Sequence, residues 1–443
     1  MITRFTPEKI SKLASNEIFV FGSNLAGMHG GGAARAAVRH FGAIMGQGVG
    51  LQGQSYAIPT MQGGVDTIRP YVDEFILFAH HHPELTFIVT RIGCGIAGFH
   101  DADIAPLFAN ALMMDNVVLP LSFVKILMPW TSEAAISNNK KVTWDDTAFC
   151  KMKDKMDYEG LRELRIVEYY NTIDFVKQGY YYVEGQRVNI PQVGSSQFYD
   201  APIAIGPASA AYDTQICVEN NDCLEEALLL IRHGYHPAVL NLADRHIPGG
   251  CVLQGSGAQE ESIFRRTNLY TSLYQFHDMA QYFGVPRANK SYPMDRHHGG
   301  IYSKDVTVFR HTEDCGYRLM DHPYQIDIIT VAALAMPPVM PDGTLGANDT
   351  QTTLDKMRTI MRLGLNGGND ALVLGAFGCG AFRNPPRFIA TLFSQVINEP
   401  EFVGKYKRIH FAIFDNHAAF ANSKEGNYKA FRDVLLGDIS PIL

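Results

Sequence analysis

Short apolar segments alternate with helix-like segments in both halves of this 443-residue chain. In the N-terminal half the apolar segments are residues 17–22 and 85–90. In the C-terminal half they are residues 238–242, 325–331, 371–375 and 408–414. Such alternation is typical of α/β proteins in which helices cover both faces of a sheet. The sequence therefore predicts an α/β fold of three layers, α/β/α, in each half.

A polar stretch between the two halves marks the expected domain boundary. Residues 137–141 are Ser-Asn-Asn-Lys-Lys, a turn-prone sequence. We expect a first domain over residues 1–130, a linker over 131–154 and a second domain over 155–443. The charged segment 154–177 predicts a helical extension at the start of the second domain.

Each half also carries two glycine-rich loops in the same order. The N-terminal loops run over residues 24–34 and 93–99, and the C-terminal loops over residues 241–251 and 378–382. Each loop follows an apolar segment, and loops at the carboxyl ends of sheet strands form ligand sites in α/β proteins. Glycine lets backbone N–H groups approach an anionic ligand closely. The repeated pattern favours a duplicated binding scaffold.

Only one of these loops is followed closely by paired carboxylates. Glu260 and Glu261 come directly after Gln259 and open a predicted helix. Such carboxylates can protonate a leaving group or activate water, and the alternative is that they only complement the helix dipole. Because adjacent helical residues point about 100° apart, we expect different roles for the two glutamates. The combination favours a hydrolase that acts on a phosphate-bearing ligand.

Composition and charge narrow the possible partners. A net charge of −7 argues against a strong grip on nucleic acid, although a local basic face remains possible. The sequence has no run of 18 or more apolar residues, and it begins without the apolar core of a signal peptide. The seven cysteines occur singly, which favours a reducing compartment. We expect a cytoplasmic protein without a membrane partner, a cofactor or a metal, since no histidine cluster has metal-site spacing.

The C-terminal half resembles the bacterial and fungal-type poly(ADP-ribose) glycohydrolases. Pro248-Gly249-Gly250 and Gln259-Glu260-Glu261-Ser262 look like the signature of this family, in which a Gly-Gly-Gly run and Gln-Glu-Glu lie on a macrodomain fold. Residues 375–385 are similar to its diphosphate-binding loop, and the resemblance covers roughly residues 155–443. Cys251 stands where the family usually has the third glycine, and we expect it to narrow the loop beside the scissile ribose.

The resemblance assigns the main catalytic role to Glu261. It implies that Glu261 protonates the leaving 1″–2′ glycosidic oxygen and then activates water, that Glu260 orients the ribose, and that Gln259 holds the loop. The second loop is expected to offer N–H groups to the pyrophosphate at a helix N-terminus. The ligand-binding residues so implied are Asn241, Gly249, Gly250, Cys251, Gln259, Gly378, Cys379, Gly380, Ala381 and Phe382.

The N-terminal half is similar to the macrodomain superfamily more loosely. Its first loop has an asparagine followed by glycines, but no Gln-Glu-Glu follows. The likeness implies a second macrodomain-like unit with a mixed sheet, which binds an ADP-ribose-type ligand without the same acid–base chemistry. The residues implied to bind this ligand are Asn24, Gly30, Gly31, Gly32, Gly93, Gly95, Ile96, Gly98 and Phe99.

The function expected from these residues is that of a glycohydrolase with an N-terminal ADP-ribose-binding module. It would release ADP-ribose from poly(ADP-ribose) or from ADP-ribosylated protein or nucleic acid, and the sequence does not choose among these substrates. Two alternatives stay open at this point. The protein could bind ADP-ribose without catalysis, or it could be a scaffold or antitoxin-like partner of an ADP-ribosyltransferase.

Overall fold

The computed structural model describes residues 5–7, 9–112, 114, 116–127, 144–205, 211–415 and 417–437. Contacts within the chain divide it into two compact units. Unit 1 comprises residues 1–187, 253–256 and 313–318, and unit 2 comprises residues 188–252, 257–312 and 319–443. The helices over residues 146–178 fall in unit 1 in this division, and the expected domain boundary at residue 155 stays a prediction.

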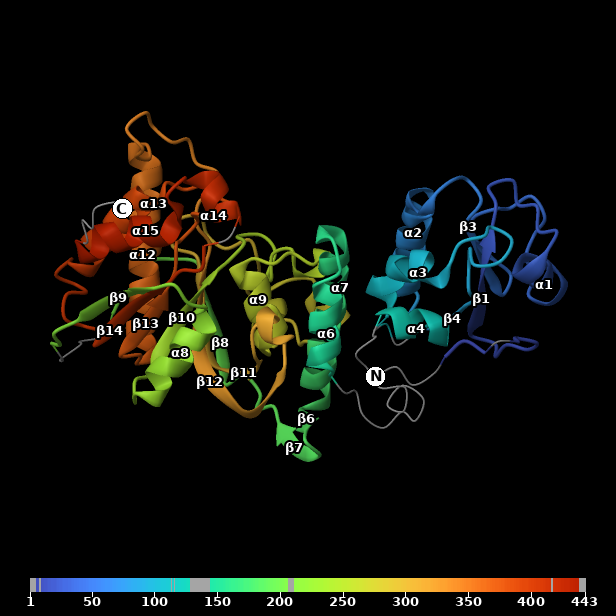
Figure 1. Cartoon of the computed structure of the whole chain (residues 1–443), viewed down its shortest axis with the longest axis horizontal. Coiled ribbons are helices and arrows are strands. Elements are labelled where there is room, and N and C mark those ends of the chain that lie inside the picture. Colours follow the sequence, from blue (N-terminus) through green and yellow to red (C-terminus); the bar gives the residue numbers. More distant parts are fainter. Residues whose placement is uncertain are drawn as a thin grey trace. The chain divides into compact units, whose positions relative to one another are not determined.

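Unit 1 is built on a mixed sheet with the strand order β2-β3-β1-β4-β5, and Figure 1 labels its strands β1, β3 and β4. Its strands are β1 (Glu17–Ser23), β2 (Gly50–Gln52), β3 (Ser55–Pro59), β4 (Thr86–Val89) and β5 (Val117–Val118). β1 pairs in parallel with β3 and β4, whereas β2 is antiparallel to β3. Strands β1 and β4 coincide with the two segments predicted from the apolar pattern.

Helices cover both faces of this sheet. Successive side chains of a strand point to opposite faces, so Ile18 and Val20 of β1 join one core with Phe75 of α2, while Phe19 and Phe21 join another with the alanines of α1. The described helices of unit 1 are α1 (Gly32–His40), α2 (Arg69–His81), α3 (Asp101–Ile104), α4 (Leu121–Leu127), α6 (Asp146–Lys153) and α7 (Tyr158–Gln178), with the 3-10 turns η1 (Val65–Thr67), η2 (Ala105–Ala111) and η5 (Glu313–Cys315). Unit 1 therefore has three layers.

Unit 2 is built on a larger mixed sheet with the order β8-β11-β12-β10-β13-β14-β9. Its strands are β8 (Ser195–Tyr199), β9 (Gln215–Glu219), β10 (Pro237–Leu242), β11 (Gly300–Arg310), β12 (Leu319–Val331), β13 (Ala371–Leu374) and β14 (Arg408–Ala412). Strands β12, β10, β13, β14 and β9 run parallel, and β11 is antiparallel to β12 and β8. A separate hairpin consists of β6 (Tyr180–Val183) and β7 (Gln186–Asn189).

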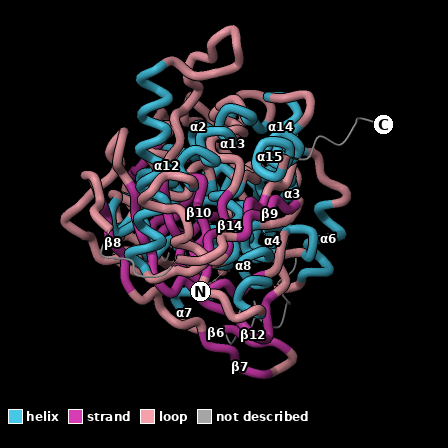
Figure 2. Tube along the Cα trace, turned by 90° about the vertical axis from the view of Figure 1, so that its left-hand side faces the viewer, coloured by secondary structure: helices cyan, strands magenta, loops and turns pink. Residues whose placement is uncertain are grey.

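The central strand β10 is buried on both faces. Leu240 lies in a core with Met357 of α12 and Phe393 of α13, whereas the next side chain along the strand, Val239, is buried on the face where α8 and α9 contact β10. Figure 2 shows the strands and helices in a second view. The described helices of unit 2 are α8 (Cys223–Arg232), α9 (Gln259–Arg266), α10 (Leu269–Leu273), α11 (Ala280–Phe283), α12 (Ala347–Gly367), α13 (Pro386–Ile397), α14 (His417–Asn422) and α15 (Gly426–Leu436), with η3 (Val252–Gln254) and η4 (Tyr274–Phe276).

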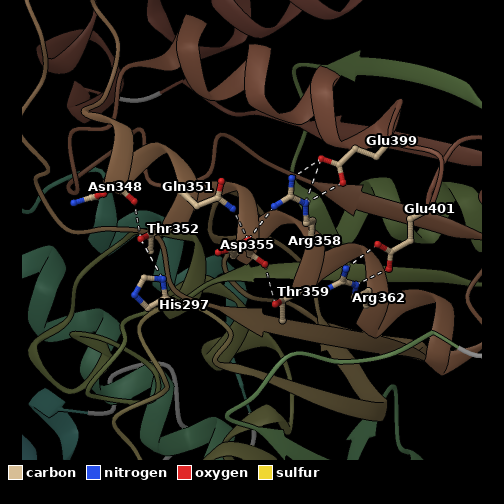
Figure 3. Close-up of polar contacts among 10 residues, drawn as sticks. All are labelled: His297, Asn348, Gln351, Thr352, Asp355, Arg358, Thr359, Arg362, Glu399 and Glu401. Atoms are coloured by element: carbon tan, nitrogen blue, oxygen red, sulfur yellow. Dashed lines mark hydrogen bonds and ion pairs between the residues drawn. The ribbon is translucent and has the colours of Figure 1, made fainter.

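The long helix α12 is fastened to the segment that follows α13 (Figure 3). Arg358 forms a two-pronged ion pair with Glu399, with an Nη2–Oε1 distance of 2.7 Å. Arg362 does the same with Glu401, with an Nε–Oε1 distance of 2.6 Å. Planar two-pronged pairs of this kind fix orientation as well as position. The helix is thus held in a defined rotation about its axis. Among the described residues, none of the helices is both long and apolar enough to cross a membrane.

Candidate active site

The first glycine loop of unit 2 begins at the carboxyl end of the central strand. β10 pairs in parallel with β12 and β13, so the segments that follow these strands meet at one edge of the sheet. Gly249 and Gly250 have φ values of +81° and +53°, a region in which a Cβ is unfavourable. A Cβ at Gly250 would lie 2.8 Å from Glu261 Oε1 and 3.1 Å from Glu260 Oε2. Glycine therefore lets the loop backbone approach both carboxylates.

Glu260 has both carboxylate oxygens occupied by donors of the protein. It is 4% exposed. Its Oε1 accepts hydrogen bonds from Asn241 Nδ2 (3.2 Å) and the N–H of Gly249 (3.1 Å), and its Oε2 accepts one from the N–H of Asp244 (2.8 Å). Burial and the adjacent charge of Glu261 raise the pKa of Glu260 well above its usual value, and the three donors only partly oppose this rise. Glu260 is thus tied to the strand end and the glycine loop.

Glu261 has one oxygen occupied and one without a partner. Its Oε1 accepts a hydrogen bond from the N–H of Cys251 at 3.0 Å. Its Oε2 is buried and makes no hydrogen bond with any residue in the described part of the chain. An unpaired buried polar atom costs on the order of 1–3 kcal/mol. A hydroxyl or water of a bound ligand can supply the missing hydrogen bond, so Glu261 is the carboxylate that is available for proton transfer.

The backbone of Cys251 contacts Glu261, and this contact does not need glycine. The described non-glycine residues with a positive φ are Glu184, Asp305, Tyr317, Met336 and Arg383, so Cys251 is outside the left-handed region. Cys251 is an exposed residue. The backbone N–H of residue 251 can therefore bind the Glu261 carboxylate whether this residue is cysteine or glycine.

Two side chains shape the connection between β10 and α9. Gln259 accepts a hydrogen bond from the N–H of Leu242 (2.9 Å) and donates one to the carbonyl of Leu240 (2.7 Å), and so ties the start of α9 to the end of β10. Asp244 Oδ1 accepts hydrogen bonds from two N–H groups that follow it, the nearer being that of His246 at 2.7 Å. These contacts fix the turn that leads into the glycine loop.

The second glycine loop, after β13, offers a row of backbone donors. The N–H groups of Gly380, Ala381 and Phe382 make no hydrogen bond with the described residues. Helix α13 begins only at Pro386, so the expectation that these donors lie at a helix N-terminus is wrong. Successive N–H groups in a turn form an anion-binding nest without a helix. The arrangement suits a phosphate or diphosphate.

Buried contacts hold this second loop in shape. Gly378 has a φ of +74°, and its carbonyl accepts a hydrogen bond from Asn384 Nδ2 at 3.0 Å. Asn422 Nδ2 donates to the carbonyl of Cys379 at 2.8 Å. Burial raises the pKa of the Cys379 thiol, so the thiol stays protonated and fills space rather than acting as a nucleophile.

In unit 1 the two glycine loops also follow neighbouring parallel strands, β1 and β4. A Cβ at Gly31 would lie 2.7 Å from Ile96 Cδ1, so the two loops approach each other. Asn24 closes its own turn, because its Nδ2 donates to the carbonyl of Met28 (3.0 Å) and its Oδ1 accepts from the N–H of the same residue (3.1 Å). Asn241, at the matching place in unit 2, instead contacts a carboxylate.

The other expected residues of unit 1 lie on the same two loops. Phe99 packs beside the position that a Cβ of Gly93 would take, with its Cδ2 3.4 Å away. The glycines with a positive φ in these loops include Gly32, Gly93 and Gly98. Space is open around the positions that a Cβ would take at Gly30, Gly95 and Gly98.

Two groups beside the carboxylate pair were not expected from the sequence. Asp244 lies between Asn241 and the glycine loop in the sequence. This position is the one feature of the sequence that could have indicated a place for Asp244 in the site. Tyr292 comes from a distant segment, and its buried hydroxyl makes no hydrogen bond within the described part of the chain. Burial, together with the charges of Glu260 and Asp244, raises the pKa of Tyr292 well above its usual value. Tyr292 is therefore a neutral phenol that lies near Glu260 and Asp244.

This geometry defines a class of protein. An α/β/α unit presents, at the carboxyl edge of its parallel strands, a nest of N–H groups and a buried carboxylate pair behind a glycine loop. The groups of such a site can bind an anion and can exchange a proton with a ligand.

Within this class, residues 170–311 match the family model for the catalytic domain of microbial-type PARG, poly(ADP-ribose) glycohydrolase. The match contains the first glycine loop and both glutamates. The resemblance stated for the C-terminal half is confirmed: residues 170–311 match the catalytic domain of a glycohydrolase of the microbial PARG type.

Solved structures of bacterial PARG are similar to the chain. The enzyme from Thermomonospora curvata is 25% identical, with 61% of this chain and 98% of that chain covered and a TM-score of 0.48. Its complex with the inhibitor ADP-HPD is also 25% identical, with 60% and 97% covered and a TM-score of 0.46. PARG from Deinococcus radiodurans in complex with ADP-ribose is 28% identical, with 51% and 86% covered and a TM-score of 0.40. Among curated proteins, none matches the chain.

Proposed function

We propose that unit 2 hydrolyses the glycosidic bond between ADP-ribose and poly(ADP-ribose) or another ADP-ribosylated macromolecule, with Glu261 as the catalytic residue. The observation that carries this proposal is that Glu261 Oε2 is buried and has no hydrogen-bond partner among the described residues. The other oxygen of the same carboxylate accepts a hydrogen bond from the glycine loop, through the N–H of Cys251. Glu260 has no such oxygen, because both of its oxygens accept hydrogen bonds from the protein. The match to a PARG-type catalytic domain supports the same reaction.

In the proposed reaction Glu261 acts first as an acid and then as a base. Its proton passes to the leaving glycosidic oxygen while the bond from this oxygen to C1″ of the ribose breaks, and the bonding electron pair stays on the oxygen. Water then adds to C1″ and gives its proton to the Glu261 carboxylate, which restores the acid. Glu260 holds Asn241 and Gly249 in place around the ribose.

The diphosphate of the ADP-ribose is proposed to lie on the nest that follows β13. The unpaired N–H groups of Gly380, Ala381 and Phe382 support this placement. Because β13 is the immediate neighbour of β10 in the sheet, a ligand can reach from the nest to the carboxylate pair. Backbone donors bind an anion without a charged side chain, so a net charge of −7 does not oppose this binding.

The variant Glu261→Gln tests the catalytic role. The amide cannot donate an acidic proton, so release of ADP-ribose from an automodified ADP-ribosyltransferase should fall at least about 100-fold. Calorimetry with ADP-ribose should show a dissociation constant within about threefold of the wild type, because the nest is unchanged. Glu184→Gln, at an exposed position in the β6–β7 hairpin, serves as the matched control and should leave release unchanged. Undiminished release by Glu261→Gln would refute the assignment.

We further propose that unit 1 binds a second ADP-ribose without hydrolysing it. Its two glycine loops approach each other at the carboxyl ends of β1 and β4. Large apolar side chains are exposed on the segments that follow β1, β3 and β4, namely Leu25, Met28, Met61 and Ile96, with Ile96 72% exposed. Apolar side chains beside two glycine loops suit a ligand with an aromatic base and a diphosphate.

Gly31 offers a test that preserves the fold of unit 1. It is the N-cap residue of α1, with a φ of −144°, and both Asp and Ser are favoured at N-caps. Gly31→Asp places a negative charge at the expected diphosphate, whereas Gly31→Ser adds no charge. Both variants introduce a Cβ that must displace Ile96 Cδ1 from 2.7 Å, so the difference between them reports the charge alone. Calorimetry of the full chain should give two bound ADP-ribose molecules for the wild type, and the dissociation constant of the second should be at least about tenfold weaker for Gly31→Asp than for Gly31→Ser. A single site in the wild-type chain at millimolar ADP-ribose would contradict the proposal.

A further inference from the structure

A cluster of titratable side chains lies at the edge of the unit 2 sheet, apart from the carboxylate pair. β9 is the last strand of this sheet and pairs in parallel with β14 (Figure 1), and the strands β14 and β13 lie between it and β10. The register sets Cys217 of β9 opposite His410 of β14. Paired residues of neighbouring strands point to the same face of a sheet, so the thiol and the imidazole are neighbours. Cys217 lies on this edge strand and is partly exposed.

Glu226 of α8 fixes the orientation of His410. Its Oε1 lies 2.7 Å from His410 Nδ1, and its Oε2 accepts a hydrogen bond from Asn221 Nδ2 at 2.8 Å. Glu226 is itself buried. The other ring nitrogen of His410, Nε2, is also buried and makes no hydrogen bond within the described part of the chain. The imidazole therefore has one nitrogen bound to α8 and one nitrogen without such a partner.

The imidazole of His410 is positively charged at neutral pH. Burial opposes this charge, but the neighbouring side chains of Cys217 and Glu226 outweigh it and raise the pKa of His410 to about 9. A charged imidazole carries a proton on both of its nitrogens. Because the proton on Nδ1 is donated to Glu226, the proton on Nε2 is available to the sulfur of Cys217.

A second cation lies beside the same thiol. Arg408 comes two residues before His410 on β14, so its side chain points to the same face of the sheet. Its Nε donates a hydrogen bond to Tyr235 Oη at 3.1 Å. This hydrogen bond raises the pKa of Arg408, and the proximity of Cys217 contributes to the rise. An imidazolium and a guanidinium beside a thiol favour the thiolate, which is the nucleophilic form.

Other cysteines of the chain lie in surroundings that oppose a thiolate. Burial and the nearby carboxylate of Asp101 raise the pKa of Cys94 to about 12. Burial also raises the pKa of Cys223 to about 12, and it raises the pKa of Cys150. Cys217 differs from these three cysteines because its neighbours include two cations.

We propose that Cys217 is a modification site, a nucleophilic thiol that His410 and Glu226 activate and that hydrogen peroxide oxidises to a sulfenic acid. This site is separate from the proposed glycohydrolase site, because none of these residues belongs to the carboxylate pair or to the nest. In the reaction the thiolate sulfur forms a bond to one oxygen of the peroxide while the O–O bond breaks. The departing hydroxide takes the proton from His410 Nε2 and leaves as water. The sulfur is oxidised by two electrons and the peroxide is reduced.

Alkylation by iodoacetamide measures the nucleophilicity of each thiol in the intact chain. After brief treatment at pH 7, mass spectrometry of peptides compares Cys217 with Cys315, which is exposed. We expect Cys217 to react at least about tenfold faster, although it is less exposed, because the thiolate is the reacting form. Hydrogen peroxide followed by dimedone, which traps sulfenic acids, should label Cys217 before Cys315. Alkylation of Cys217 no faster than that of Cys315, or a dimedone label confined to other cysteines, would refute the proposal.

His410→Gln tests the activating role, because glutamine is neutral but can still donate a hydrogen bond to Glu226. Alkylation of Cys217 should become at least about tenfold slower in this variant, while alkylation of Cys315 stays unchanged. His233→Gln, at an exposed histidine that follows α8, is the matched control and should change neither rate.

The buried Cys379 reports on folding in the same samples. If Cys379 stays unmodified in His410→Gln, an unchanged rate at Cys217 refutes the role of His410. If Cys379 becomes reactive, the variant has unfolded, and Arg408→Gln at a partly exposed position decides instead. Loss of this second cation should slow the alkylation of Cys217 at least about threefold, and an unchanged rate would refute the activation by neighbouring charge.

Discussion

Replacement of Lys356, a lysine of α12 that is only 2% exposed, by methionine should stabilise unit 2 at neutral pH. Lysine and methionine both have unbranched side chains, so the apolar contacts of the stem with α12 and its neighbours are largely kept. The substitution removes a positive charge that is buried beside Arg245 and Arg296.

The magnitude follows from the pKa of Lys356. It falls from 10.5 to about 8 on folding, which corresponds to roughly 3 kcal/mol, since a tenfold change in protonation is about 1.36 kcal/mol. Below pH 8 the lysine is protonated in both states, and the full penalty is present. Between about pH 8 and 10.5 the unfolded state binds the proton and the folded state does not, so stability rises with pH. Above 10.5 both states are neutral and the penalty has gone.

Urea unfolding of the wild type and Lys356→Met at pH 7 and pH 10 measures this difference. We expect the variant to be more stable by up to about 3 kcal/mol at pH 7, and by much less at pH 10. Lys304→Met should differ from the wild type by less than about 0.5 kcal/mol at both values, because this lysine is exposed. A variant that is less stable than the wild type at pH 7, or a difference that does not shrink by pH 10, would refute the reasoning.

Three further substitutions test the framework of the site. Gly250→Ala introduces a Cβ at a φ of +53° and 2.8 Å from Glu261 Oε1. We expect the free energy of unfolding in urea to fall by about 1–2 kcal/mol, and kcat/KM for poly(ADP-ribose) to fall at least about tenfold. Arg266→Met leaves Asp222 and Glu225 without the buried guanidinium that each contacts at 2.7 Å, so the free energy of unfolding in urea should fall by about 3–5 kcal/mol; a fall below about 1 kcal/mol would show that the pairs are dispensable. Cys251→Gly keeps the N–H that binds Glu261, and its kcat/KM should stay within about threefold of the wild type, whereas a larger loss would assign a role to the thiol.

The strands around the site could be predicted from the sequence because they are short apolar runs between polar or turn-forming segments. The segments 238–242, 371–375 and 408–414 coincide closely with β10, β13 and β14. Helix α12 was not predicted, although it is one of the longest of those described. Its buried face carries Thr352, Lys356 and Thr359 beside its apolar residues, which obscures the apolar periodicity that identifies an amphipathic helix.

Local spacing determined the parts of the site that lie close together along the chain. The glycine loop and the carboxylate pair are separated by one short segment, so their proximity follows from a strand, a turn and a helix. Spacing did not reveal that Glu261 has a carboxylate oxygen without a hydrogen-bond partner whereas Glu260 has none. That difference depends on which N–H groups of the folded loop donate to each carboxylate. Nor did it show that Asn24 and Asn241, which have matching places in the sequence, have different partners.

The sequence by itself thus determined the α/β alternation, the two glycine loops of each half and the glutamate pair, because each depends on neighbouring residues. The tertiary structure alone decided which charges meet around Lys356 of α12. Arg245 follows β10, Arg296 precedes β11 and Lys356 lies in α12, so their approach requires parallel strands to bring distant segments to one edge of the sheet. The pKa of a side chain depends on burial and on such neighbours, and for that reason the low pKa of Lys356 has no signature in the sequence.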